Sequence, residues 1–127
     1  ELAQTLIDNS SMDRVFFANS GAEANEGAVK LARKYGKLHR NGAYEVITAL
    51  NSFHGRTLGM IAATGQPKYQ AEWNPLAPGF LNVEYDNLDA IKKANPKAQG
   101  SNKTTPPVKP IMWTKRAHVM NSDCFDL

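Results

Sequence analysis

Residues 16–26 constrain the fold of this chain most strongly, because an apolar run passes there directly into the start of a helix. The run Phe16-Phe17-Ala18 is followed by a turn of small residues and then by a long amphipathic pattern. That order is typical of a buried strand, a tight loop and a helix N-terminus. We therefore expect a short buried strand over residues 15–18 and a helix that begins near Ala22.

The turn itself, Ser20-Gly21-Ala22, has two interpretations. Backbone N–H groups at a helix N-terminus lack intrahelical partners and carry partial positive charge, so the turn is a candidate phosphate-binding site. Its residues are small enough to let an anion approach the backbone. The alternative is structural, because Ser20 and Glu23 have the spacing of a capping box, which satisfies a helix start by itself. The residues alone leave both interpretations open.

A long helix is expected to follow this turn. Asn41 and Gly42 supply its stop signal. Apolar residues recur at helical spacing along one side, and the basic residues fall largely on the opposite side, which indicates a solvent-exposed face. These basic residues are Lys30, Arg33, Lys34 and Lys37.

Strand and helix patterns alternate downstream. Residues 45–50 and residues 80–85 have the composition of buried strands. Alternation of this kind predicts the α/β fold class, with parallel strands joined by right-handed crossovers. The other expected elements are a short helix that Thr57 caps and that ends near Ala63, a loop over residues 68–79, and a helix that begins at Asp86 or Asn87 and runs to about Ala94.

A second candidate cluster follows the strand expected over residues 45–50. Phe53, His54 and Arg56 lie in the loop at its carboxyl end, where ligands collect in open α/β sheets. Phe53 is suited to stacking on a planar ring, Arg56 to binding a carboxylate with its guanidinium fork, and His54 to acid–base chemistry. The structural alternatives are a core or lid aromatic, a surface ion pair and a structural histidine. If the strand over residues 15–18 shares this sheet, both clusters face the same edge.

The last part of the chain has a different character. Residues 1–91 carry 8 Lys and Arg against 10 Asp and Glu, whereas residues 92–127 carry 7 against 2. Four of the seven prolines fall within residues 95–110, and proline removes a backbone donor and restricts the residue before it. We expect residues 95–127 to form a Pro-rich basic tail, disordered or artefactual. A nucleic-acid surface is not expected, because the positive charges are spread too thinly.

Composition narrows the remaining classes of function and location. No apolar run approaches the length of a membrane span, and no signal-peptide pattern opens the chain. Three dispersed histidines and the single Cys124 give no metal-ligand spacing, and one cysteine favours a reducing compartment. We expect a cytoplasmic protein. Because the chain begins at Glu1 rather than Met, we expect a cut or processed N-terminus. A lost transit peptide would point to a mitochondrion or plastid.

The two clusters together resemble a known family. Residues 16–35 closely resemble the first strand–turn–helix of the class III pyridoxal-phosphate-dependent aminotransferases. Residues 52–57 (Ser-Phe-His-Gly-Arg-Thr) and 64–69 (Thr-Gly-Gln-Pro-Lys-Tyr) resemble the next block of that family, and the acetylornithine aminotransferases are the nearest match. The resemblance covers roughly residues 1–94, and residues 95–127 match nothing in the family. It implies part of the large domain of a fold-type I pyridoxal-phosphate-dependent transferase, with an incomplete parallel sheet and flanking helices.

The resemblance also implies a role for each candidate residue. The turn Ser20-Gly21-Ala22 matches the backbone segment that binds the phosphate of pyridoxal 5′-phosphate. Phe53 matches the aromatic that stacks on the pyridine ring, and we place His54 beside it among the cofactor-binding residues. Arg56 matches the arginine that recognises the carboxylate of a small amino acid substrate.

Other parts of the family's site have no match in this chain. In the family a lysine forms the Schiff base with the cofactor, and an aspartate holds the pyridine nitrogen. Neither motif is present here, so we assign no catalytic residue and expect the isolated chain to be inactive. For a full-length parent the resemblance implies a homodimer with active sites at its interface.

Three functions therefore remain open. The favoured one is a fragment of an aminotransferase of arginine biosynthesis, which moves an amino group between N-acetylornithine, or a related ornithine derivative, and 2-oxoglutarate. The second is a non-catalytic module that binds phosphate or pyridoxal phosphate, or regulates a partner. The third is a class III aminotransferase that acts on another ω-amine.

Overall fold

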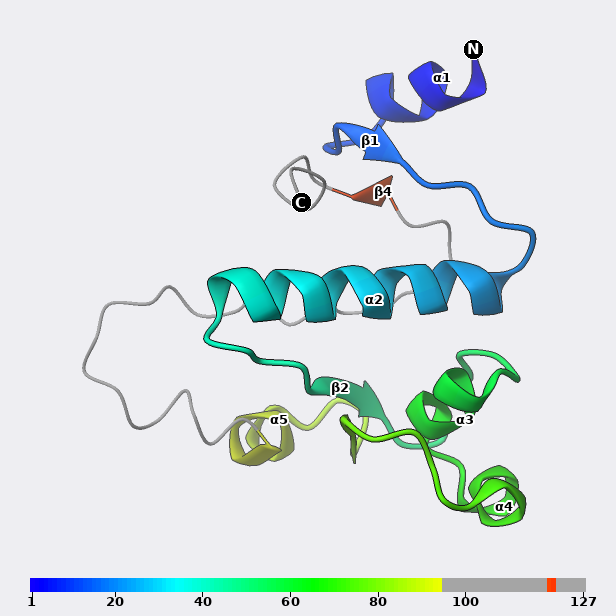
Figure 1. Cartoon of the computed structure of the whole chain (residues 1–127), viewed down its shortest axis with the longest axis vertical. Coiled ribbons are helices and arrows are strands. Elements are labelled where there is room, and N and C mark those ends of the chain that lie inside the picture. The colour runs from blue at the N-terminus through cyan, green and yellow to red at the C-terminus, as the bar shows by residue number, and fades with distance from the viewer. Residues whose placement is uncertain (95–118, 121–127) are drawn as a thin grey trace. The chain divides into compact units, whose positions relative to one another are not determined.

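The computed structural model describes residues 1–94 and 119–120 (Figure 1). The chain divides into two compact units, one formed by Glu1–Tyr44 with Lys115–Leu127 and the other by Glu45–Thr114. Most of the stretch expected to be a Pro-rich tail, residues 95–118 and 121–127, lies outside the described residues.

The first unit contains a short antiparallel strand pair. Helix α1 (Leu2–Asp8) leads into β1 (Arg14–Val15), which pairs with β4 (Val119–Met120). The buried strand expected over residues 15–18 is therefore wrong in extent. Phe16 and Phe17 lie outside β1 and are 48% and 57% exposed. The reason is that the ladder with β4 is only two residues long, so the backbone beyond Val15 has no strand partner among the described residues.

Helix α2 (Gly21–His39) confirms the long helix, and local sequence explains both of its ends. Ser20 caps the N-terminus, and Asn41 and Gly42 adopt positive φ angles of 55° and 83° just beyond the C-terminus. Its buried side is formed by small and branched residues, Ala28, Val29 and Gly36.

Gly36 has no space for a side chain. A Cβ atom there would overlap the carbonyl oxygen of Ala43. The chain turns back against the helix at this point, where the N–H of Gly42 donates to the Gly36 carbonyl at 3.1 Å and Arg33 Nε donates to the Tyr44 carbonyl at 3.1 Å.

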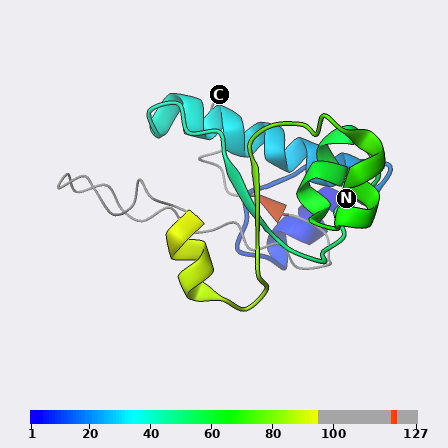
Figure 2. The same ribbon diagram turned by 90° about the horizontal axis from the view of Figure 1, so that it is seen from below.

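The second unit is built on two parallel strands, β2 (Val46–Ala49) and β3 (Phe80–Val83). Val46 pairs with Phe80, and the register continues to Ala49 and Val83. The parallel pairing confirms the expected α/β organisation, although each strand is shorter than its sequence pattern. Figure 2 shows α5 (Leu88–Ala94) on one side of the strand pair, with α3 (Leu58–Thr64) and α4 (Pro67–Gln70) on the other.

Helix α3 supplies most of the buried surface of this unit. Met60, Ile61, Ala62 and Ala63 are each 4% exposed or less, and Thr64 is completely buried. Thr57 accepts a hydrogen bond from the N–H of Met60 and caps the helix as expected. In the same way the side chain of Asn87 accepts from the N–H of Ala90 at the start of α5.

The loop expected over residues 68–79 is wrong in its first half. Helix α4 and the 3-10 helix η1 (Ala71–Trp73) occupy that stretch. Pro67 stands at the first helical position, where its missing N–H costs nothing and its φ angle is already helical. Gln70 Nε2 then anchors α4 by donating to the Ala62 carbonyl at 3.1 Å.

Among the described residues, no helix is both long enough and apolar enough to span a membrane.

Candidate functional site

The turn at the start of α2 keeps its backbone accessible. Ser20 and Gly21 are exposed, and a Cβ atom built on Gly21 would meet no atom within 4 Å. The N–H groups of Gly21 and Ala22 belong to the first turn of the helix and so have no intrahelical acceptor. An anion can therefore reach this backbone, and the helix dipole favours negative charge there.

A capping arrangement coexists with this accessible turn. Ser20 Oγ accepts from the N–H of Glu23 at 3.3 Å, as in a capping box. The Glu23 carboxylate, however, accepts from the N–H of Asn19 at 2.7 Å rather than from Ser20 itself. The structural interpretation of Ser20 and Glu23 is thus confirmed, and it uses neither the N–H of Gly21 nor that of Ala22.

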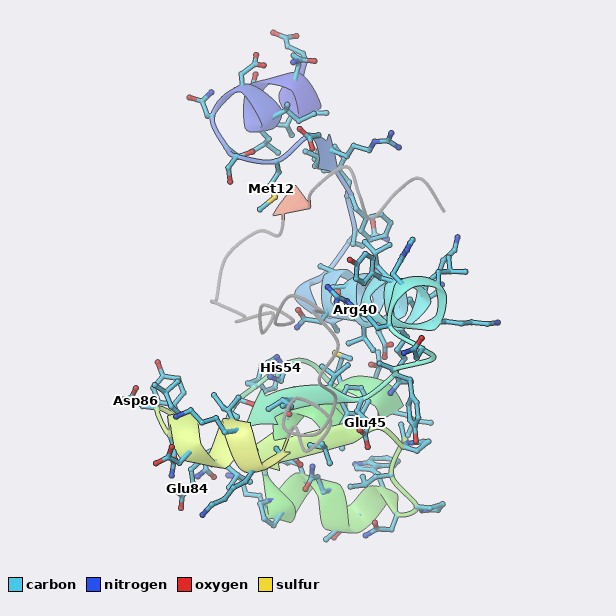
Figure 3. The ribbon with its side chains drawn as sticks, turned by 90° about the vertical axis from the view of Figure 1, so that its left-hand side faces the viewer. Met12, Arg40, Glu45, His54, Glu84 and Asp86 are labelled. Atoms are coloured by element: carbon cyan, nitrogen blue, oxygen red, sulfur yellow. The ribbon has the colours of Figure 1, made fainter. Side chains whose placement is uncertain are left out.

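The second candidate cluster lies at the carboxyl end of the parallel pair. In Figure 3, Glu45 marks the amino end of the strands, and Glu84 and Asp86 mark the carboxyl end, to which the loop with His54 also belongs. Positions at this edge are where parallel sheets collect ligands.

Partly buried polar contacts hold the loop after β2. The N–H of His54 donates to Thr64 Oγ1 at 3.1 Å, and Ser52 Oγ donates to the Thr64 carbonyl at 2.9 Å. Gln66 Nε2 donates to the Ser52 carbonyl at 2.6 Å, which ties the loop to the start of α4. The backbone of the loop is therefore fixed while Phe53 remains 60% exposed. That exposure excludes a core role for Phe53 within this unit.

Arg56 makes aromatic contacts instead of the expected alternative, a surface ion pair. Its guanidinium carbon lies 4.9 Å from the centre of the Phe53 ring and 4.2 Å from the centre of the Tyr69 ring. Lys68 Nζ lies 4.7 Å from the same Tyr69 ring. No acidic side chain of the described residues forms an ion pair with Arg56 or Lys68. A guanidinium has five N–H donors, so Arg56 beside these rings retains donors for a carboxylate.

These contacts change the acidity of Tyr69. Hydrogen bonding from Arg56 lowers the pKa of the phenol, and hydrogen bonding and charge from Lys68 add to the effect. Lys68 and Tyr69 were absent from the residues that the sequence pattern assigned to the site. The available signal was Pro67, which marks a helix start and so predicts that Lys68 and Tyr69 are held on a helical turn.

The two candidate clusters belong to different units of the chain. Ser20, Gly21 and Ala22 lie in the first unit, and Phe53, His54 and Arg56 lie in the second. In the described ranges no group of His, Cys, Asp and Glu side chains has the arrangement of a metal site.

Comparison with known proteins decides the family. The family model for the class-III aminotransferases matches residues 1–115. This chain belongs to the class-III aminotransferases. The match covers both clusters and extends past residue 94, where the sequence resemblance was expected to end.

Curated class-III relatives agree with this assignment. The chain is 60% identical over 92 residues to the acetylornithine aminotransferase of Thermosynechococcus vestitus, a match that covers 72% of this chain and 22% of the relative. It is 54% identical over 92 residues to acetylornithine aminotransferase 2 of Bordetella pertussis, over 72% of this chain and 23% of the relative. The chain thus spans less than a quarter of the length of the curated relatives it matches.

Solved structures of aminotransferases share the fold. The ornithine aminotransferase of Toxoplasma gondii, crystallised with partial occupancy of pyridoxal phosphate at its active site, superposes with a TM-score of 0.67 at 29% identity. That match covers 72% of this chain and 22% of the other. The described elements are therefore part of the α/β domain of a class-III aminotransferase.

Proposed function

We propose that this chain is a segment of an acetylornithine-type aminotransferase. The complete enzyme would transfer an amino group between N-acetylornithine, or a related ornithine derivative, and 2-oxoglutarate. The observation that carries the proposal is the identity of 54–60% to acetylornithine aminotransferases over 92 residues. Identity at this level favours that activity over transfer from another ω-amine.

Each unit offers groups suited to one part of pyridoxal 5′-phosphate. Gly21 and Ala22 offer backbone N–H groups without an intrahelical acceptor at the start of α2, with open space beside Gly21 for a phosphate. Phe53 offers an exposed aromatic face for the pyridine ring, with His54 next to it. When bound, this cofactor supplies an electron sink for chemistry at the substrate's amino carbon. The protein residues would bind and orient it.

Arg56 is the proposed site for a substrate carboxylate. Its guanidinium is exposed, lies over two aromatic rings and has no acidic partner among residues 1–94. The N–H groups at its edge match the two oxygens of a carboxylate.

We propose that the 127-residue chain does not catalyse transamination by itself. It spans 22–23% of the first relatives, and no lysine in it has the sequence context of the family's Schiff-base lysine. For the complete protein we propose a homodimer in the cytoplasm, or in a mitochondrion or plastid if a transit peptide is removed.

Two assays on the purified chain test these statements. The first measures glutamate formation from N-acetylornithine and 2-oxoglutarate with added pyridoxal phosphate, and we expect no rate above the protein-free background. A rate above background that disappears in Arg56→Gln would contradict the inactivity. The second measures pyridoxal phosphate binding by equilibrium dialysis, with pyridoxal as the phosphate-free control. Phosphate-dependent binding without turnover fits both a segment and the alternative, a non-catalytic binding module. Sequencing the gene beyond codon 127 distinguishes the segment from the non-catalytic binding module.

A further inference from the structure

Two cationic side chains gather at the ring of one tyrosine, Tyr69, in the second unit. Arg56 comes from the loop after β2, whereas Lys68 and Tyr69 come from α4. The guanidinium carbon of Arg56 and the Nζ of Lys68 both lie within 5 Å of the Tyr69 ring centre, at 4.2 Å and 4.7 Å. Like charges repel, so bringing two cations to one ring has an energetic cost that an anion would remove.

Hydrogen bonds from the interior fix the position of this cluster. Before Tyr69 in the sequence, Gln66 Nε2 donates to the Ser52 carbonyl at 2.6 Å. After it, Gln70 Nε2 donates to the Ala62 carbonyl at 3.1 Å. The N–H of Tyr69 donates to the Gln66 carbonyl at 3.0 Å. Tyr69 is therefore held on a fixed turn, and the side chain of Arg56 lies over its ring.

The chemistry of the cluster favours a carboxylate. The aromatic ring attracts the guanidinium to its face and so reduces the number of orientations open to Arg56. The guanidinium edge then binds one carboxylate, and the Lys68 ammonium adds a second positive charge close by. A dicarboxylate brings a negative charge for each cation, whereas a monocarboxylate satisfies only one.

We propose that Lys68 and Tyr69 join Arg56 in one dicarboxylate-binding cluster, in which the Tyr69 ring is the positioning element and Lys68 supplies the second charge. This inference deepens the proposed function, since 2-oxoglutarate is a dicarboxylate. Its test uses neither pyridoxal phosphate nor turnover. The inference and the proposed function can therefore fail independently of each other.

The experiment is a titration of the unaltered 127-residue chain with 2-oxoglutarate at constant ionic strength. The Arg56 Nε–Hε resonance, assigned with Arg56→Lys, reports binding by NMR. We expect a saturable shift with 2-oxoglutarate and weaker binding of acetate. Because the ring contact of an exposed cation is modest, Tyr69→Leu should weaken binding about fivefold, whereas Tyr69→Phe, which keeps the ring, should bind within about twofold of the unaltered chain.

Matched variants separate the cluster from general charge effects. Lys68→Gln should bring the affinity for 2-oxoglutarate down toward that for acetate, whereas Lys93→Gln on α5 and Tyr85→Leu should leave both unchanged. A non-saturable shift in the unaltered chain would overturn the proposal. Equal binding by Tyr69→Leu and Tyr69→Phe would overturn the positioning role, and equal effects of Lys68→Gln and Lys93→Gln would overturn the role of Lys68.

Discussion

The backbone N–H of His54 donates a hydrogen bond of 3.1 Å to Oγ1 of Thr64, which is completely buried. Thr64 Oγ1 in turn donates to the Met60 carbonyl at 2.7 Å. A single hydroxyl therefore connects the last turn of α3 to the loop that carries Phe53 and Arg56. The backbone of the second candidate cluster is held by this interior polar contact, whereas the Tyr69 ring limits the orientations of the Arg56 side chain.

Thr64→Val tests this connection, because it keeps the shape of the side chain and removes the hydroxyl. The N–H of His54 then loses its acceptor, and we expect the free energy of unfolding to fall by about 1–3 kcal/mol. Urea unfolding followed by circular dichroism measures the change. Thr5→Val is the control, since the exposed Thr5 hydroxyl donates to the carbonyl of Glu1, the N-cap of α1, at 3.2 Å. Equal losses of unfolding free energy in the two variants would show that the buried contact stabilises the chain no more than the exposed one.

Gly36→Ala should destabilise the chain, against the usual preference of helices for alanine. Helix propensity alone predicts a gain of about 1 kcal/mol. At Gly36, however, the new Cβ overlaps the Ala43 carbonyl oxygen, which is backbone and cannot rotate away. Gly21→Ala is the matched control, because nothing lies within 4 Å of its Cβ position. Thermal unfolding should show a lower midpoint for Gly36→Ala than for Gly21→Ala, and the reverse order would contradict the close approach.

Ser20→Ala should weaken the start of α2. Loss of the contact from the Glu23 N–H to Ser20 Oγ is expected to cost about 1 kcal/mol of stability, because that helix donor loses its acceptor. The measurement is the unfolding free energy, with Ser11→Ala in the turn after α1 as the control. The same variant is expected to bind pyridoxal phosphate more weakly in equilibrium dialysis. Unchanged stability together with unchanged binding would remove Ser20 from both roles.

The acidity of Tyr69 gives a pH-dependent prediction. Hydrogen bonding from Arg56, with Lys68 contributing, holds the pKa of this phenol below its usual value of 10.0 in the folded chain. Between the lowered pKa and 10.0 the folded state binds fewer protons than the unfolded state. The free energy of unfolding should therefore rise with pH across that window, and this contribution is lost as pH falls through the folded pKa.

Arg56→Gln removes the largest cause of this shift. The pKa of the Tyr69 phenol should then return toward its usual value, as followed by the tyrosine Cζ resonance in a pH titration by NMR. Arg14→Gln, in the other unit, is the control and should leave the titration of Tyr69 unchanged. A Tyr69 resonance that titrates identically in Arg56→Gln and the unaltered chain would contradict the contact.

Local sequence signals predicted most helices and the pairing of the strands. Ser20 and Thr57 were recognisable as caps because a hydroxyl stands directly before an amphipathic or apolar run, and α2 and α3 begin there. Parallel pairing of β2 and β3 followed from the helical pattern between them, because strands that alternate with helices pair in parallel.

The features that were missed depend on contacts distant in sequence. Asn82 Nδ2 donates to Thr48 Oγ1 at 2.8 Å, across 34 positions, and no local pattern marks that pair. The strand over residues 15–18 was overestimated because an apolar run predicts burial only where a sheet neighbour covers it, and β1 has a ladder of two residues. The contact of Arg56 with Tyr69 depends on α4. That helix was not predicted, because aromatic residues and prolines over residues 68–79 favoured a loop.

The most direct test of the central claim is the sequence of the genomic template and mature transcript across codons 85–130 and beyond, with every frame translated. If the chain is a segment of an acetylornithine-type aminotransferase, a continuing frame supplies the Schiff-base lysine and the aspartate motif of the family. A mature transcript whose reading frame ends after Leu127 would contradict the enzyme assignment for this product. Pyridoxal phosphate binding by the chain would then test the binding-module alternative.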